Sequence, residues 1–252
     1  MQILYSRNMS RPLLLIGLPI LLIVLYGVFV SVRTIRLISK SAILVKDSRR
    51  FERINGGTPR ILVIGDSTGV GTGVKNPAGS VAGRFGQDYL NAEIKNVSVN
   101  GWKVADALKN FPDVPAQSFD LVMLQIGAND IIRRTPMDAF TRDLALLFAQ
   151  AKVAGKHVVA LHSGNVGLAP FFSWPLGWYY GRKTLTYRAQ YMRIAAEKNV
   201  TYVNLLVDAK DDPFLTNIPR YYAPDLLHLT EDGYGYWYSR IRETMKDAHI
   251  AL

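Results

Sequence analysis

The sequence predicts an α/β protein: a three-layer α/β/α sandwich with a five-stranded parallel sheet, preceded by one transmembrane helix. Two observations lead to this prediction. From Pro59 onward, short apolar stretches alternate with helix-like stretches, as in parallel sheets covered by helices on both faces. Near the N-terminus, an uncharged run has the length of about 20 residues that spans a bilayer as a helix. The 252 residues leave room for one such domain and an appendage.

The uncharged run extends from Leu13 to Val32. Its internal Gly and Pro residues are tolerated in transmembrane helices. The competing interpretation is a cleaved signal peptide, which has an apolar core of about 7–15 residues and a small-x-small cleavage site. The segment Phe29–Arg33 is a poor cleavage site. We therefore expect residues 1–32 to form an N-terminal tail and a retained single-pass anchor.

A basic segment follows, over residues 33–58. Its Lys and Arg residues are attracted to anionic headgroups by roughly 1 kcal/mol each near the surface. They are Arg33, Arg36, Lys40, Lys46, Arg49, Arg50 and Arg53. An interfacial helix and a solvated linker are both compatible with this segment. The net charge is +10, but no nucleic-acid motif accompanies it, so a membrane surface is the expected partner rather than nucleic acid.

The orientation of the anchor follows from the distribution of charge. Six Lys or Arg residues lie within about 18 residues after the run, which favours a catalytic domain on the cytoplasmic side by the positive-inside rule. Arg7 and Arg11 in the short N-terminal tail argue for the opposite orientation.

The third region, residues 59–252, reads as the globular domain. Its predicted strands are Arg60–Gly65, Ile94–Val99, Leu121–Ile126, His157–His162 and Thr201–Leu205. Its predicted helices are Gly79–Leu90, Val104–Phe111, Pro136–Ala154, Lys183–Lys198 and Glu231–Ala248. The segment Asp208–Tyr222 reads as a long loop, and loops of that length in compact domains are often functional.

Ser67 is the candidate nucleophile. It follows the first predicted strand directly, in Gly65-Asp66-Ser67, and ligands of open α/β sheets bind at the carboxyl ends of the strands. A serine hydroxyl is a weak nucleophile that requires a base, and that base requires an orienting acid. Asp225-Leu226-Leu227-His228 supplies both. Taken alone, such a pair more often forms an ordinary surface ion pair.

Four segments together resemble, in order, the signature blocks of the SGNH (GDSL) hydrolase family, whose fold is flavodoxin-like. They are Gly65-Asp66-Ser67, Gly101 after Val97-Ser98-Val99-Asn100, Gly127-Ala128-Asn129-Asp130, and Asp225-Leu226-Leu227-His228. The resemblance implies a catalytic triad of Ser67, His228 and Asp225. It also implies an oxyanion hole from the backbone N–H groups of Ser67 and Gly101 and the side-chain amide of Asn129. One departure is Leu229, where the family often has proline after the histidine.

The sequence gives less support to other kinds of catalytic site. The chain has no cysteine, which excludes disulfides, thiolate metal sites and cysteine nucleophiles. No set of His and carboxylate residues has convincing metal spacing, so we expect neither a metal nor a cofactor. Gly65-Asp66-Ser67-Thr68-Gly69 also fits the α/β-hydrolase nucleophile elbow, but that fold places several strands before the serine.

An aromatic stretch, residues 171–180, follows the fourth predicted strand. Its Trp174 and Trp178 are candidate substrate-binding residues, lining an acyl pocket or entering the membrane interface. The alternative is that the stretch packs beneath a loop. The sequence thus predicts a membrane-anchored serine esterase acting on a lipid-like or small acyl ester through an acyl-enzyme. The alternative function is a catalytically silent binding protein tethered to the membrane, and the oligomeric state is left open.

Overall fold

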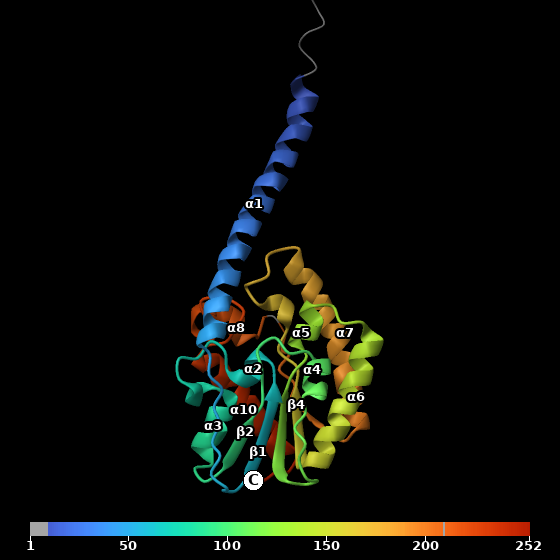
Figure 1. The fold of residues 1–252 in the computed structure, drawn as a ribbon. Coiled ribbons are helices and arrows are strands. Elements are labelled where there is room, and N and C mark those ends of the chain that lie inside the picture. The colour runs from blue at the N-terminus through green and yellow to red at the C-terminus, as the bar shows by residue number, and fades with distance from the viewer. Residues whose placement is uncertain (1–9, 209) are drawn as a thin grey trace, which may run out of the picture.

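A five-stranded parallel sheet lies between two layers of helices, and a long N-terminal helix extends away from this domain (Figure 1). The computed structural model describes residues 10–208 and 210–252. The first nine residues of the predicted N-terminal tail, with Arg7, lie outside the described residues.

The sheet has the strand order β2-β1-β3-β4-β5, and all neighbouring strands are parallel. The strands are β1 (Arg60–Gly65), β2 (Glu93–Asn96), β3 (Phe119–Gln125), β4 (Gly155–Leu161) and β5 (Thr201–Tyr202). The predicted fold class is therefore confirmed. β5 is shorter than expected, because only the Val203 amide continues the ladder, donating to the Ala160 carbonyl at 2.9 Å.

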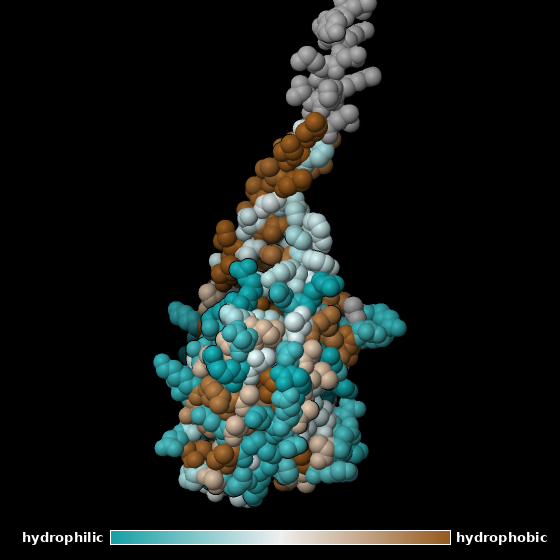
Figure 2. Space-filling model, turned by 90° about the vertical axis from the view of Figure 1, so that its right-hand side faces the viewer, coloured by the Kyte–Doolittle hydropathy of each residue, from teal (hydrophilic) through white to brown (hydrophobic). Residues whose placement is uncertain are grey.

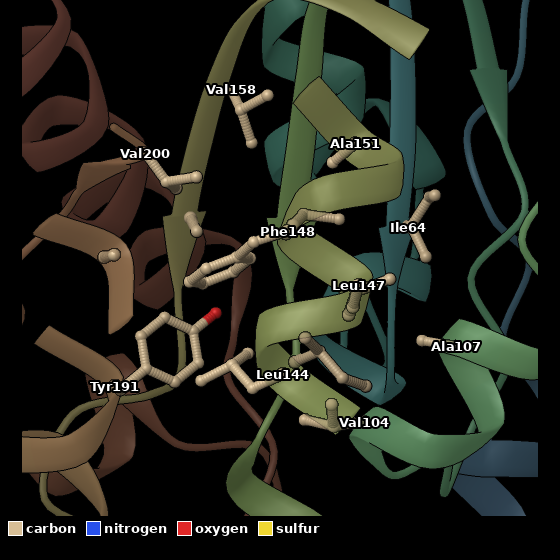
Figure 3. Packing of buried hydrophobic residues seen from close by; sticks show 14 of the residues in the cluster. Ile64, Val104, Ala107, Leu144, Leu147, Phe148, Ala151, Val158, Tyr191 and Val200 are labelled. Carbon is tan, nitrogen blue, oxygen red and sulfur yellow. The ribbon is translucent and has the colours of Figure 1, made fainter. Parts of the chain in front are cut away.

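Helices cover both faces of the sheet. Successive residues of a strand point to opposite faces, and β1 divides its side chains accordingly: Ile61 and Val63 pack with α3 (Val81–Asp88) and α10 (Glu231–Asp247). Leu62 and Ile64 pack on the other face, against α4 (Val104–Lys109), α6 (Met137–Ala154) and α7 (Leu176–Glu197). Figure 3 shows the packing on this second face, with Phe148 of α6 next to Tyr191 of α7 and Leu147 of α6 on the side of Ile64 of β1.

The helix starts follow local capping chemistry. The side chain of Ser80 accepts a hydrogen bond from the Gly83 amide at 3.1 Å and begins α3 at the predicted place. α7 begins seven residues earlier than the sequence predicted, at Leu176. Short helical turns occupy the connections: α2 (Ser67–Val70), η1 (Pro77–Gly79), α5 (Ala128–Ile132), η2 (Val166–Leu168), α8 (Pro213–Thr216) and α9 (Ile218–Tyr221). The last two lie in the segment that was expected to be a long loop.

The N-terminal helix, α1 (Ser10–Asp47), continues through the apolar run into the basic segment without a break. Within the described residues, one helix is long and apolar enough to cross a membrane, and it is this one. Figure 2 shows its hydrophobic side chains above a domain surface of mixed character. After α1, the chain packs against the domain. Arg53 and Ile94 of β2 exchange two backbone hydrogen bonds: the Arg53 N–H donates to the Ile94 carbonyl at 2.9 Å, and the Ile94 N–H donates to the Arg53 carbonyl at 2.7 Å. The chain around Arg53 is therefore attached to the edge of the sheet.

Candidate active site

The carboxyl ends of β1 and β3 point toward the side of the domain on which α1 lies (Figure 1). A cavity of about 260 Å³ opens there. Four residues from the four predicted blocks line it: Ser67, Gly101, Asn129 and His228. These residues are far apart in sequence, and the parallel sheet brings them together because all its strands end at one edge.

Ser67 is the first residue of α2, directly after the β1 strand. The turn between strand and helix is tight, since a Cβ on Gly65 would lie 2.5 Å from the Gln125 carbonyl oxygen of β3. Asp66 caps the short helix: its Oδ1 accepts from the Thr68 amide and the Thr68 hydroxyl, both at 2.9 Å. This arrangement fixes the backbone that carries Ser67 at the cavity wall.

His228 is oriented by Asp225, whose Oδ2 lies 2.6 Å from the imidazole Nδ1. The other carboxylate oxygen accepts from the backbone N–H groups of Leu227 at 3.1 Å and His228 at 3.0 Å. Leu226 has a φ of 61°, which lets the chain turn tightly enough for these contacts. Asp225 is fully buried and His228 nearly so.

The environment of Asp225 favours its ionised form. Burial opposes ionisation, but the hydrogen bonds and the positive charge of His228, with two backbone N–H donors, outweigh it and lower the pKa of Asp225. An ionised Asp225 holds the proton of the imidazole on Nδ1 and leaves Nε2 available as a base.

Three N–H donors border the same cavity. In the described part of the chain, the backbone N–H groups of Ser67 and Gly101 donate to no protein acceptor. Asn129, in α5, donates one amide hydrogen to the Trp102 carbonyl at 3.0 Å. Its other contact, to Asp66 Oδ2, is 3.5 Å, too long for a strong hydrogen bond. Gly101 has a φ of 81°, a conformation that favours glycine.

Asp66 lies beside these donors. Burial raises its pKa to about 6, although the contacts with Thr68 and the charge of His228 oppose this shift. Its contacts with Thr68 give Asp66 a structural role in capping α2. The raised pKa depends on complete burial, which no local sequence pattern reveals.

His162 is buried directly after β4. Burial lowers its pKa to about 3, with a smaller effect from the charge of Arg188. Its Nδ1 lies 3.1 Å from the Tyr202 hydroxyl. A histidine in this state is neutral at physiological pH and forms part of the core.

The structure does not bring Trp174 and Trp178 to the cavity, whose lining includes neither residue. Their side chains are 72% and 64% exposed. Because α7 starts at Leu176, Trp178 lies on its first turn rather than in a loop over the active site. The acyl-pocket role predicted for these two tryptophans is therefore corrected. Phe172 and Tyr180 of the same stretch pack against the core instead.

Several residues of the cavity wall were not predicted, and two of them come from outside the catalytic domain. Ser41 and Val45 belong to α1, yet both line the cavity with Ser67 and His228. Their position depends on how α1 lies against the domain.

Comparison with known proteins agrees with this geometry. The model of the GDSL-like lipase/acylhydrolase family matches residues 63–236. No curated protein matches the chain. Among solved structures, a variant of an acetyl xylan esterase from Geobacillus stearothermophilus has a TM-score of 0.57 at 21% identity, covering 75% of this chain and 95% of its own.

Two further structures show the same fold. A putative lipolytic protein of the G-D-S-L family from Desulfitobacterium hafniense has a TM-score of 0.59 at 17% identity, covering 74% of this chain and 99% of its own. An esterase from Pseudoalteromonas, solved with monoethylphosphonate as inhibitor, has a TM-score of 0.56 at 16% identity, covering 75% and 97%. Since the family model matches well over half of the sequence, the chain belongs to the GDSL-like lipase/acylhydrolase family and is a serine hydrolase of ester bonds.

Proposed function

We propose that the protein is a membrane-anchored esterase that cleaves a carboxylic ester, lipid-like or with a small acyl group, through Ser67, His228 and Asp225. The observation that carries this proposal is the single cavity lined by Ser67, His228, Gly101 and Asn129, with Asp225 bonded behind the histidine. A nucleophile, a base and oxyanion donors around one space are the parts that acyl transfer requires.

The reaction proceeds in two halves. In the first, Nε2 of His228 takes the Ser67 proton while the Ser67 Oγ attacks the carbonyl carbon of the ester. The charge that develops on the carbonyl oxygen is stabilised by the N–H groups of Ser67 and Gly101 and by the Asn129 amide. The C–O bond then breaks, and the alcohol leaves with the proton from His228. In the second half, His228 deprotonates a water molecule that attacks the acyl carbon. The bond from that carbon to Ser67 Oγ then breaks, the acid is released, and His228 returns its proton to the Ser67 oxygen.

Membrane anchoring rests on α1 and on its surroundings. The apolar part of α1 is exposed along its length, which is costly for a helix in water. The Trp174 carbonyl accepts a hydrogen bond from Tyr26 of α1. Trp174 and Trp178 are both exposed and have the amphipathic rings found at membrane interfaces. The guanidinium of Arg182 lies 5.7 Å from the centre of the Trp178 ring, so aromatic and basic side chains occur together. The positive-inside rule favours the cytoplasmic side for the domain, and residues 1–32, 33–58 and 59–252 remain our proposed division of the chain.

The test is hydrolysis of p-nitrophenyl esters, from acetyl to palmitoyl, by the full chain in detergent. We expect Ser67→Ala to abolish turnover and labelling by a fluorophosphonate probe, while Ser239→Ala, on the exposed face of α10, retains both. Hydrolysis that persists in Ser67→Ala would refute the serine mechanism. A folded wild-type protein that neither turns over esters nor reacts with the probe would support the silent binding protein instead.

A further inference from the structure

α1 is docked on the catalytic domain, beyond the point where its apolar run ends. Its less exposed positions recur at alternating spacings of four and three residues, the spacing of a helix face that packs against a neighbour. These positions are Val30, Thr34, Leu37, Ser41 and Leu44, followed by Ser48 just after the helix; Arg33, next to Thr34, is also less exposed. Leu37, in the middle of this face, is only 5% exposed.

Side-chain hydrogen bonds attach this part of the chain to the catalytic domain at three points along its length. The Tyr26 hydroxyl donates to the Trp174 carbonyl at 2.6 Å. The Arg33 guanidinium donates to the Phe171 carbonyl at 2.9 Å, and to the Pro170 carbonyl and the Ser173 hydroxyl. The Asn100 amide donates to the Ser48 hydroxyl at 3.0 Å. From residue 26 to residue 48 a helix rises about 33 Å, so α1 is fixed along the domain and is more than a flexible tether.

This docking places Ser41 and Val45, one turn apart, in the wall of the active-site cavity. Asn100, which bonds to Ser48 just after α1, directly precedes the predicted oxyanion residue Gly101. Much of the remaining wall is apolar, with Ile132, Val166, Phe214, Leu227, Leu229 and Trp237 among its residues. The wall therefore suits a hydrocarbon group close to Ser67.

The apolar surface continues from the cavity along α1. Ile38 lies seven residues before Val45, on the same side of the helix, and is 53% exposed. Ile35, 64% exposed, lies about one turn further toward the apolar run. The cavity of about 260 Å³ is slightly smaller than ligand pockets of about 300–1,000 Å³. A short acyl group fits inside it, whereas a long acyl chain has to extend along α1.

We propose that the C-terminal part of α1 is a substrate-binding wall, in which Ser41 and Val45 contact the acyl chain of a lipid ester drawn from the bilayer in which α1 is anchored. The anchor thereby determines substrate specificity as well as location. This inference rests on the proposed esterase function, since it names the substrate class for the same cavity.

The first experiment measures whether a lipid-like molecule binds against Val45, and it requires no ester hydrolysis. Because the chain has no cysteine, Val45→Cys introduces a single thiol whose reaction with a maleimide can be followed in the amphipol-stabilised full chain. Ile43→Cys is the matched control, at almost the same height but on the far side of the helix and 60% exposed. The probe is hexadecylphosphocholine, which has a long alkyl chain and no carboxylic ester.

At about ten times its dissociation constant, a bound probe leaves about one site in ten open, so labelling of Val45→Cys should slow about tenfold. Labelling of Ile43→Cys should stay unchanged. Equal slowing of both variants, or slowing of neither, would overturn the proposal. Because this readout needs no hydrolysis, it is distinct from the Ser67→Ala test of the esterase function.

The second experiment measures specificity. We expect Val45→Trp to lower kcat/KM for p-nitrophenyl palmitate about tenfold or more relative to the butyrate, a change that corresponds to about 1.4 kcal/mol. Ile43→Trp should preserve the wild-type ratio. If Val45→Trp does not fold, Val45→Ala, which widens the wall, should raise the ratio instead. An unchanged ratio in a folded Val45 variant would contradict the proposed wall.

Discussion

Oδ2 of Asp225 lies 2.6 Å from Nδ1 of His228, while Oδ1 accepts the backbone N–H of the same histidine at 3.0 Å. One carboxylate therefore holds both the ring and the backbone of His228. The two contacts have different chemical requirements: the bond to the ring depends on an acceptor for Nδ1–H, whereas the backbone contact needs only an oxygen. This difference allows the catalytic contribution of Asp225 to be separated from its structural one.

Asp225→Asn tests this separation. The amide oxygen can still accept from the backbone of His228, but the amide group can no longer stabilise the imidazolium or fix the required tautomer. We expect kcat to fall by about 10⁴-fold, the size of effect seen when the acid of a serine protease triad is neutralised. The melting temperature and circular dichroism should change little. Asp211→Asn, on the exposed loop, is the control, and a loss below tenfold would argue against Asp225 as the orienting acid.

Asn129→Ala tests the oxyanion hole. The side-chain amide has one strong acceptor, the Trp102 carbonyl at 3.0 Å, so its remaining N–H is available for the carbonyl oxygen of the substrate. Removal of one such donor typically lowers kcat by about 10²–10³-fold. We expect this loss in kcat with little change in KM, because the charge develops only in the transition state. Asn110→Ala, at the exposed end of α4, should retain full activity. A change confined to KM would assign Asn129 to ground-state binding.

Asp66 predicts a pH-dependent difference in stability. Its pKa is about 6 in the folded protein against 3.8 for an unperturbed aspartate. A group with a raised folded pKa stabilises the fold at low pH, and this stabilisation is lost as the pH rises from about 4 through 6. In Asp66→Asn the side-chain oxygen can still cap α2, but the amide does not ionise. The variant therefore does not lose stability in this pH range as the wild type does. The stability of Asp66→Asn relative to wild type should therefore improve between pH 4 and pH 8, by up to about 3 kcal/mol.

Chemical denaturation of the full chain in detergent at a series of pH values measures this difference. Asp247→Asn, at the exposed end of α10, controls for the general effect of removing one carboxylate. A constant difference between Asp66→Asn and wild type across this pH range would mean that Asp66 has an ordinary pKa.

The sequence anticipates the convergence of the candidate site residues on one cavity better than it anticipates the rest of the cavity wall. Ser67, Gly101 and Asn129 each follow a strand or its extension, and strands of a parallel sheet end at one edge, so their convergence follows from the fold class. The strand–helix alternation itself depends on local hydrophobic patterns. Both kinds of information are present in short segments of the sequence.

The remaining features depend on contacts between distant segments. Arg33 bonds to the Phe171 carbonyl, 138 residues away, although its position after the apolar run had indicated lipid headgroups. The start of α7 was missed because Trp178 and Tyr179 have no strong preference for helix. No local pattern predicts that Val45 of an anchor helix lines an active site, because that position is set by the docking of one element on another.

Trp174 and Trp178 provide the last prediction. Both rings are largely exposed, and the Trp174 carbonyl is bonded to Tyr26 within the apolar run of α1. If α1 spans a bilayer, the loop that carries Trp174 must lie at the membrane surface, because it reaches as far along the helix as Tyr26. Lipids brominated on their acyl chains should therefore quench the tryptophan fluorescence of the full chain in vesicles. Trp174→Phe/Trp178→Phe should remove most of this quenching, whereas Trp102→Phe, beside the cavity, should preserve it. Quenching that persists undiminished in the double variant would come from Trp102 or Trp237, and would contradict the placement of Trp174 and Trp178 at the membrane surface.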